Sequence, residues 1–332
     1  MILNYLGKTI DSVSVTKELE KDKIEFIKKN YYNENKDLAL DQLKKILNEN
    51  KYSMNHIYNY YFERLASDTV LYNAKWSINE MLNSDDLIQL FINRTYRNPK
   101  MYNKDLMTNF KTSIRLGGKG IVRKPSNFPL KECVRLIEKY ALNSDKKIYV
   151  DTSCGWGVRM LASAILGINY VGFDVNEPLI EKLNEFGNDI KSIKPSWDFK
   201  IFNSGSQYLK QSCIDRADIM LTSPPYFNLE VYGDNTYDKE DTINQSYDNW
   251  LELFLKPTLE NSYKYIKANG YVLINIKSFD DYDLVKDTIE TAKQVGFEHV
   301  GFDVLKNIKR PLTDTSKNND NSEDVIVFRK VV

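Results

Sequence analysis

The pattern of apolar and polar residues changes near residue 116. Beyond it, short apolar runs alternate with segments of helical periodicity, which predicts an α/β fold with a doubly wound, mostly parallel sheet. The predicted strands cover residues 147–151, 170–174, 199–203, 217–222, 271–277, 299–305 and 324–330, and one of the last pair is expected to be an antiparallel edge strand. The predicted helices cover residues 130–142, 158–166, 178–186, 250–266 and 283–295.

Before residue 116 the pattern is helical. Apolar residues recur at helical spacing from about residue 12 to residue 95, and the aromatic residues among them are expected to form a core. A helix is expected to start at Ser67-Asp68, because these side chains can cap a first turn. The sequence therefore predicts a helical region over residues 1–115 and a sheet domain over residues 116–332.

Between these two parts lies a stretch rich in basic residues. From Arg94 to Lys124 a single acid, Asp105, accompanies Arg94, Arg97, Lys100, Lys104, Lys111, Arg115, Lys119, Arg123 and Lys124. Aromatic residues are interleaved with them, and cations spaced by rings suit a nucleic-acid contact surface. A solvated basic linker is the alternative. The whole chain has 46 Lys plus Arg and 46 Asp plus Glu, so only this local charge argues for a nucleic-acid partner.

Composition excludes several classes of protein. No apolar run approaches the length of a membrane span, and the first residues lack the pattern of a secretory signal, so a cytoplasmic protein without membrane attachment is expected. The three cysteines are not in paired spacing, which favours reduced thiols over disulfides. With only two histidines, no metal site is expected.

The first two predicted strands end in residues that suit a nucleoside. Gly155 and Gly157 allow the backbone of the first turn to approach a ligand at a helix N-terminus, and Asp174 can accept hydrogen bonds from two ribose hydroxyls. A nicotinamide cofactor normally needs a third glycine, where this chain has Met160. A nucleoside without phosphates, such as S-adenosylmethionine, fits better.

The fourth predicted strand ends at Ser223-Pro224-Pro225-Tyr226. Two prolines fix the backbone and remove two N–H donors, while their carbonyl groups remain able to accept hydrogen bonds. Ser223 adds a further acceptor and Tyr226 a flat apolar face, so an amino group on a planar base could be held here. The alternative is that the two prolines simply end a strand and begin a loop.

Three of these segments together resemble the amino-methyltransferases of DNA, which methylate adenine N6 or cytosine N4. They are Asp151-Thr-Ser-Cys-Gly-Trp-Gly157, Gly172-Phe-Asp174 and Thr222-Ser-Pro-Pro-Tyr226, and the resemblance covers roughly residues 124–330. Thr152 and Ser153 stand where the family usually has proline and an aromatic residue, and Asn203 stands where it commonly has an acid.

The resemblance implies roles for individual residues. The residues implied to bind S-adenosylmethionine are Lys124, Phe128, Asp151, Thr152, Gly155, Gly157, Asp174 and Asn203. The residues implied to act on the target amine are Ser223, Pro224, Pro225 and Tyr226.

The resemblance also implies methyl transfer to a base flipped out of DNA, as in restriction-modification, although the sequence does not indicate a partner nuclease. Serine before Pro-Pro-Tyr favours cytosine N4 over adenine N6. An RNA or protein-amide methyltransferase and a non-catalytic DNA-binding relative remain as alternatives.

Overall fold

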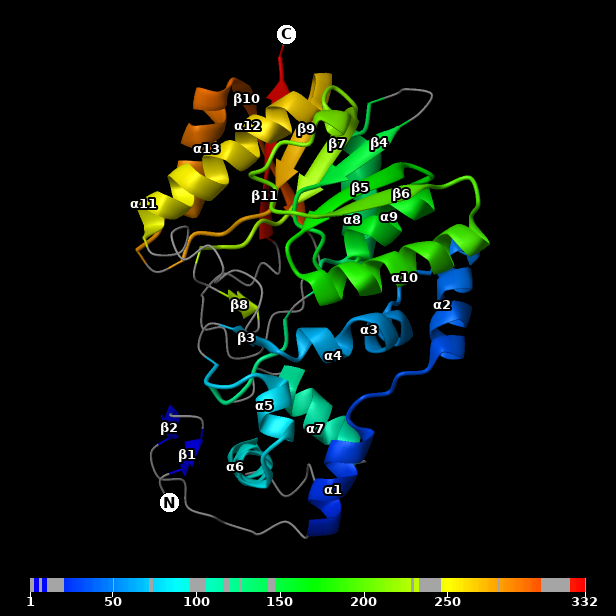
Figure 1. Ribbon diagram of the computed structural model, residues 1–332, viewed down its shortest axis with the longest axis vertical. Coiled ribbons are helices and arrows are strands. Elements are labelled where there is room, and N and C mark those ends of the chain that lie inside the picture. The colour runs from blue at the N-terminus through cyan, green and yellow to red at the C-terminus, as the bar shows by residue number, and fades with distance from the viewer. Residues whose placement is uncertain are drawn as a thin grey trace.

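The computed structural model describes residues 3–5, 8–10, 21–49, 51–71, 74–95, 106–115, 120–125, 127–142, 147–227, 230–232, 246–279, 281–305 and 323–331. Within them, a large lobe built on a sheet lies above a smaller helical lobe (Figure 1). Between the two lie helices α2 (Lys36–Glu49), α3 (Asn55–Tyr61) and α4 (Glu63–Ala66). None of the described helices is long and apolar enough to cross a membrane.

The large lobe contains a seven-stranded sheet in the order β10-β11-β9-β7-β4-β5-β6. Its strands are β4 (Ile148–Asp151), β5 (Asn169–Asp174), β6 (Phe199–Asn203), β7 (Ala217–Thr222), β9 (Ile266–Ile274), β10 (Phe297–Leu305) and β11 (Glu323–Lys330). The pairs among β4, β5, β6, β7 and β9 are parallel, and β11 runs antiparallel to both of its neighbours, β9 and β10. The predicted doubly wound α/β sheet with an N-terminal helical region is confirmed.

Helices cover both faces of the sheet (Figure 1). On one face lie α8 (Leu130–Tyr140), α9 (Val158–Leu166) and α10 (Glu177–Ile193), and on the other lie α12 (Lys256–Tyr265) and α13 (Leu284–Val295). Successive strand residues alternate between the two cores: Tyr149 packs on the first face and Val150 on the second. Because both faces are covered, the central strand β7 is buried at every position, which explains its continuous apolar run.

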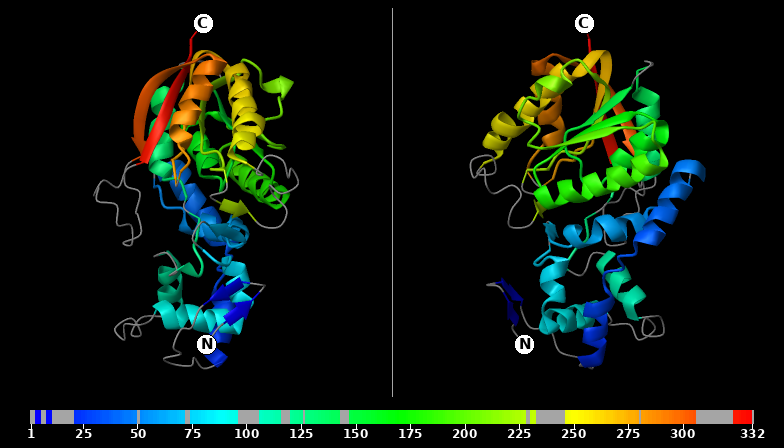
Figure 2. Two further views of the ribbon diagram at one scale, coloured as in Figure 1. Left: turned by 90° about the vertical axis from the view of Figure 1, so that its left-hand side faces the viewer. Right: turned by 45° about the vertical axis from the view of Figure 1, so that its right-hand side comes forward.

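Helices α2 (Lys36–Glu49), α3 (Asn55–Tyr61) and α4 (Glu63–Ala66) pack into the core of the first face of the sheet. A separate core joins α1 (Lys21–Asn30), α5 (Ile78–Leu82), α6 (Asp85–Thr95) and α7 (Leu106–Arg115) in the small lobe (Figure 2). Ile121 and Val122, beyond the predicted boundary, also belong to this second core. The core of the small lobe therefore includes residues from both sides of the predicted boundary at residue 116. The division of the chain into two domains stays a prediction.

Two short strand pairs lie outside the main sheet. β1 (Leu3–Tyr5) pairs with β2 (Lys8–Ile10), and β3 (Thr69–Leu71) pairs with β8 (Glu230–Tyr232), both antiparallel. The helix expected to start at Ser67-Asp68 is wrong, because Val70 pairs with Val231, far away in the sequence. Local propensity could not anticipate this long-range pairing.

The position of one strand and the start of another also differ from prediction. The antiparallel strand is β11, which lies between β9 and β10 rather than at the edge. The strand expected over residues 271–277 is β9, and it begins already at Ile266. Ile266 pairs with Ala217 and Tyr271 pairs with Ile219, so the register of β9 shifts between Ile266 and Tyr271. This irregularity interrupts the apolar pattern, which therefore did not show that the strand begins at Ile266.

The stability of the turn before α9 depends on Gly157. Its φ is +70°, and a Cβ there would lie 2.8 Å from the Phe62 ring and 3.1 Å from the Phe186 ring. We expect Gly157→Ala to destabilise the fold by about 2–4 kcal/mol, the sum of a left-handed backbone and an overpacked contact.

Gly167 provides a matched control, because its φ is +69° but its Cβ would meet only the Lys194 ammonium, at 3.8 Å. Gly167→Ala should cost only about 1–2 kcal/mol in the free energy of unfolding measured with denaturant. Equal losses for the two variants would contradict a steric requirement at Gly157.

Candidate active site

The candidate residues come together at one edge of the sheet because they end neighbouring parallel strands. β7, β4, β5 and β6 are consecutive in the sheet and end at Thr222, Asp151, Asp174 and Asn203, respectively. Asp174 pairs directly with Asn203, and Thr222 pairs with Ile274 of β9. This edge is where ligands bind in open α/β sheets.

Asp151 lies at the centre of this edge and is fully buried. Its Oδ2 accepts from Arg159 Nε at 2.8 Å and from the Tyr170 hydroxyl at 3.1 Å. Its Oδ1 accepts from Thr222 Oγ1 at 3.1 Å and from the Ser153 N–H at 3.2 Å. Both oxygens of Asp151 thus accept hydrogen bonds from the protein itself. Asp151 would therefore contribute to cofactor binding by holding in place the residues that donate to it.

Arg159 is the buried partner of Asp151. Burial disfavours the charged guanidinium, but the carboxylate of Asp151 outweighs it and raises the pKa of Arg159 above its ordinary value. The guanidinium also donates to the carbonyl of Ser153 and lies 5.2 Å above the Phe128 ring. Phe128 therefore packs against Arg159, and its implied contact with the cofactor stays a prediction.

The turn between β4 and α9 carries the two predicted glycines. Gly155 and Gly157 have φ of +53° and +70°, and Gly157 directly precedes the first residue of α9. A Cβ at Gly155 would meet only the Arg159 guanidinium, at 3.7 Å, so there is space on the side of Gly155 where a side chain would project. Thr152 is buried beneath the turn and donates to Thr222 Oγ1 at 3.0 Å, which joins β4 to β7.

Asp174 faces this turn from β5. Its carboxylate accepts from the N–H groups of Asn176 at 3.1 Å and Gly155 at 3.4 Å. Burial raises the pKa of Asp174 to about 6, and these hydrogen bonds only partly oppose the shift. Asn203, the next residue along the edge, is exposed. A half-buried carboxylate beside an exposed amide can accept hydrogen bonds from a ligand that enters here.

The Ser-Pro-Pro-Tyr turn lies on the other side of Asp151. Pro224 is buried, whereas Ser223, Pro225 and Tyr226 are half-buried. The Ser223 and Tyr226 hydroxyls are 3.2 Å apart. Tyr226 also donates toward the main-chain oxygen and Oδ1 of Asn275, at 3.1 Å and 3.2 Å.

Lys124 has its side-chain partners in the helical region. Its ammonium group donates to Glu63 Oε1 at 2.8 Å and lies 4.4 Å from the centre of the Tyr58 ring. Burial lowers the pKa of Lys124, and Glu63 opposes this shift. The implied contact of Lys124 with the cofactor stays a prediction, and its position indicates a role at the junction between the lobes.

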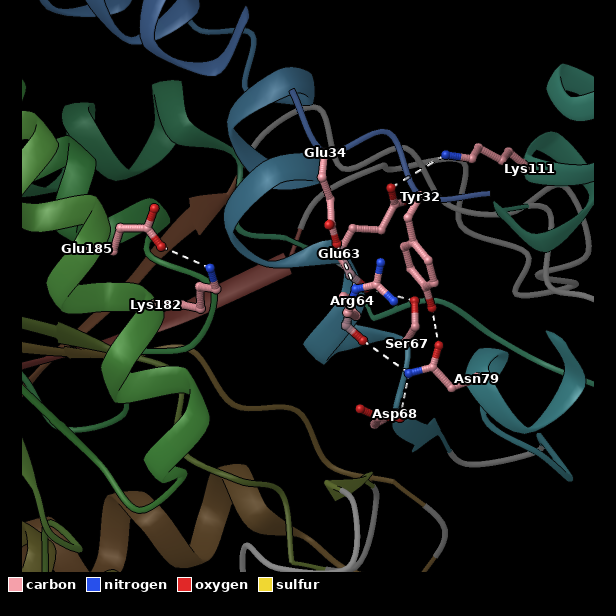
Figure 3. A network of polar contacts seen from close by, with 10 residues as sticks. All are labelled: Tyr32, Glu34, Glu63, Arg64, Ser67, Asp68, Asn79, Lys111, Lys182 and Glu185. Atoms are coloured by element: carbon pink, nitrogen blue, oxygen red, sulfur yellow. Dashed lines mark hydrogen bonds and ion pairs between the residues drawn. The ribbon is translucent and has the colours of Figure 1, made fainter. Parts of the chain in front are cut away.

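Glu63 also binds Lys111, which reaches it from α7 of the small lobe with Nζ 3.5 Å from Oε2 (Figure 3). Glu63 is only 1% exposed, so two cations of the basic stretch are committed to one buried carboxylate. Of the same stretch, Arg115 is exposed at the end of α7. Residues 96–105 and 116–119 lie outside the described residues, so a nucleic-acid contact by the basic stretch stays a prediction.

Sequence reasoning missed two residues of this site, Arg159 and Asn275. Each carried a signal: Arg159 is the one charged residue in α9, and Asn275 is the polar residue that directly follows the buried end of β9. The signal of Asn275, a polar residue ending an apolar strand, is the one that identified Asp174.

No protein-family model and no curated protein matches the chain. Solved structures do match. A TehB-like SAM-dependent methyltransferase from Corynebacterium glutamicum is 16% identical with a TM-score of 0.38, over 71% of this chain and 100% of that chain. An rRNA methylase from Streptococcus thermophilus is 14% identical with a TM-score of 0.37, over 63% and 99%. The [4+2]-cyclase SpnF is 12% identical with a TM-score of 0.41, over 60% and 80%. Likenesses this low assign neither a reaction nor a substrate.

Glu63 should contribute to stability through the junction of the lobes. Glu63→Gln removes the charge that pairs with Lys111 and Lys124, and we expect a loss of about 1–3 kcal/mol in the free energy of unfolding. Glu34→Gln is the control, because Glu34 forms an ion pair with Arg64 in which both side chains are exposed, at 39% and 59%. The control should change stability little, and a loss as large as that of Glu63→Gln would contradict the special role of the buried carboxylate.

Proposed function

We propose that this protein transfers a methyl group from S-adenosylmethionine to the exocyclic amine of a nucleic-acid base, with cytosine N4 in DNA as the first candidate and adenine N6 in DNA as the second. The observation that carries this proposal is the placement of two unlike sites on adjacent strands. The glycine turn and Asp174 suit a nucleoside, and the Ser223-Pro224-Pro225-Tyr226 turn suits an amine on a planar ring.

The residues around the glycine turn fit S-adenosylmethionine. The space where a side chain of Gly155 would project can receive part of the ligand, and Asp174 can accept from its ribose hydroxyls. Asn203 lies beside Asp174 and can hydrogen-bond the adenine edge through its amide. When bound, the cofactor supplies an electrophilic methyl group on a sulfonium.

The residues at the end of β7 would position the nucleophile. The amino group of a base is conjugated with its ring, so its lone pair is a weak nucleophile. Acceptors at the Ser223 hydroxyl and the Pro224 carbonyl would bind its two hydrogens and favour a tetrahedral nitrogen whose lone pair points at the methyl group. The ring of Tyr226 would stack on the base, which must leave the duplex at a cost of about a few kcal/mol.

A nucleic-acid substrate is supported by the local excess of basic residues, of which Arg115 is exposed. DNA is preferred because of the resemblance of Ser223-Pro-Pro-Tyr226 to the amino-methyltransferases of DNA. An RNA or protein-amide methyltransferase, and a non-catalytic DNA-binding relative, are the outcomes against which the proposal is tested.

Binding of S-adenosylmethionine should weaken in acid. The pKa of Asp174 is raised to about 6 in the free protein, and ribose hydroxyls prefer its ionised form. Affinity should therefore be full at about pH 7 and fall by about tenfold at about pH 5, where most of this carboxyl is protonated. Calorimetric titration with S-adenosylmethionine at each pH measures this affinity. Asp174→Asn should bind more weakly at about pH 7 and lose this pH dependence, and a variant with the parent's slope would contradict the assignment.

Methyl transfer should be visible directly in nucleosides. Unmethylated genomic DNA and total RNA are each incubated with the protein and labelled S-adenosylmethionine, then digested and examined by mass spectrometry. We expect labelled N4-methylcytosine in DNA, or labelled N6-methyladenine if adenine is the target.

Ser223→Ala should lower the rate of methyl transfer by on the order of 100-fold while cofactor binding persists, because it removes one acceptor of the amine.

In the nucleoside experiment, label in RNA alone would assign an RNA substrate to the protein. Cofactor binding without label in any nucleic acid would contradict the proposal.

A further inference from the structure

We infer that Asn275 and the Tyr226 hydroxyl set the direction of the Ser223 hydroxyl, so that its oxygen can only accept a hydrogen bond from the target amine. This inference rests on the proposed function and adds to it a positioning residue and a second role for Tyr226. It starts from the chain of polar contacts from Ser223 through Tyr226 to Asn275.

Asn275 is held rigidly at the end of β9. It is 5% exposed, and its N–H donates to the carbonyl of Thr222 at 2.9 Å. Its Nδ2 donates to the carbonyl of Asp324 on β11 at 3.3 Å. Because the amide nitrogen is used in this way, Oδ1 is the atom that faces Tyr226.

The number of protons decides the direction of the chain. The two oxygens of Asn275 that face Tyr226 can only accept, and the tyrosine hydroxyl has a single proton to give. That proton goes to Asn275. The contact of 3.2 Å between the two hydroxyls is then a hydrogen bond only if Ser223 donates and Tyr226 accepts. The reverse arrangement would leave two carbonyl oxygens facing a hydroxyl oxygen without a proton between them, which is repulsive.

The direction matters for the chemistry. A serine that donated its proton to the amine nitrogen would occupy the lone pair that must attack the methyl group. With its proton committed to Tyr226, Ser223 presents only lone pairs, and these bind an N–H of the amine and leave the nitrogen lone pair available. Tyr226 therefore contributes its hydroxyl as well as its ring, and Asn275 acts through it without touching the substrate.

The test separates the hydroxyl of Tyr226 from its ring. Tyr226→Phe keeps the stacking face and releases the Ser223 proton, so kcat should fall by about tenfold, the loss of roughly one hydrogen bond. KM for the nucleic acid and Kd for S-adenosylmethionine should stay within about twofold, because neither depends on this hydroxyl. Tyr140→Phe is the matched control: its hydroxyl binds Asp303 Oδ2 at 3.0 Å, at the end of α8, and its loss should leave kcat unchanged.

A double-mutant cycle shows whether Tyr226 acts through Ser223. In the Ser223→Ala background, Tyr226→Phe should cause no further loss of kcat, because there is no serine proton left to direct. Single-turnover transfer of label to the nucleic acid identified above measures all four proteins.

Losses that multiply in the double variant, or a Tyr226→Phe protein with the parent's kcat, would overturn this inference and leave the proposed function intact. A parent protein that transfers no methyl group to any nucleic acid overturns both.

Discussion

The carboxylate of Asp151 is the acceptor on which the geometry of the site depends. It is buried, and it takes hydrogen bonds from Arg159 on α9, Tyr170 on β5, Thr222 on β7 and the N–H of Ser153. A buried charge is tolerated only when it is paired and its lone pairs are satisfied, so these donors cannot move independently. The turn that would bind the cofactor and the strand whose end would bind the target amine are thereby both held by Asp151.

The helical region contributes to the same geometry from outside the sheet. Phe62 packs on the face of Gly157 that a side chain would fill, and the next residue, Glu63, joins the two lobes through Lys111 and Lys124. The strand pair β3 and β8 adds a second connection, because β8 follows closely after Tyr226 in the chain. The strand β8 is therefore attached to β3 of the helical region.

Much of the fold could be predicted because the signals are local. A polar residue that ends an apolar run identified Asp174 and Ser223, the resemblance added Asn203, and parallel strands bring such ends to one edge. Interactions between distant residues could not be predicted in this way. The pairing of Val70 with Val231 overrode a helix-start signal. The ion pairs of Lys111 and Lys124 with Glu63 lie in a stretch whose composition suggested a nucleic-acid contact surface or a solvated basic linker. Asn275 had the same local signal as Asp174, but its partners lie on β7 and β11.

The central claim is that the cofactor and the target amine meet at the edge where β5, β4 and β7 end. A crystal structure of the protein with S-adenosylhomocysteine tests it most directly, because it requires no knowledge of the recognition sequence. We expect the ribose hydroxyls on the carboxylate of Asp174, the backbone of Gly155 against the ligand, and the sulfur facing Ser223 and Tyr226. A ligand bound elsewhere, or one whose sulfur faces away from Ser223, would contradict the account.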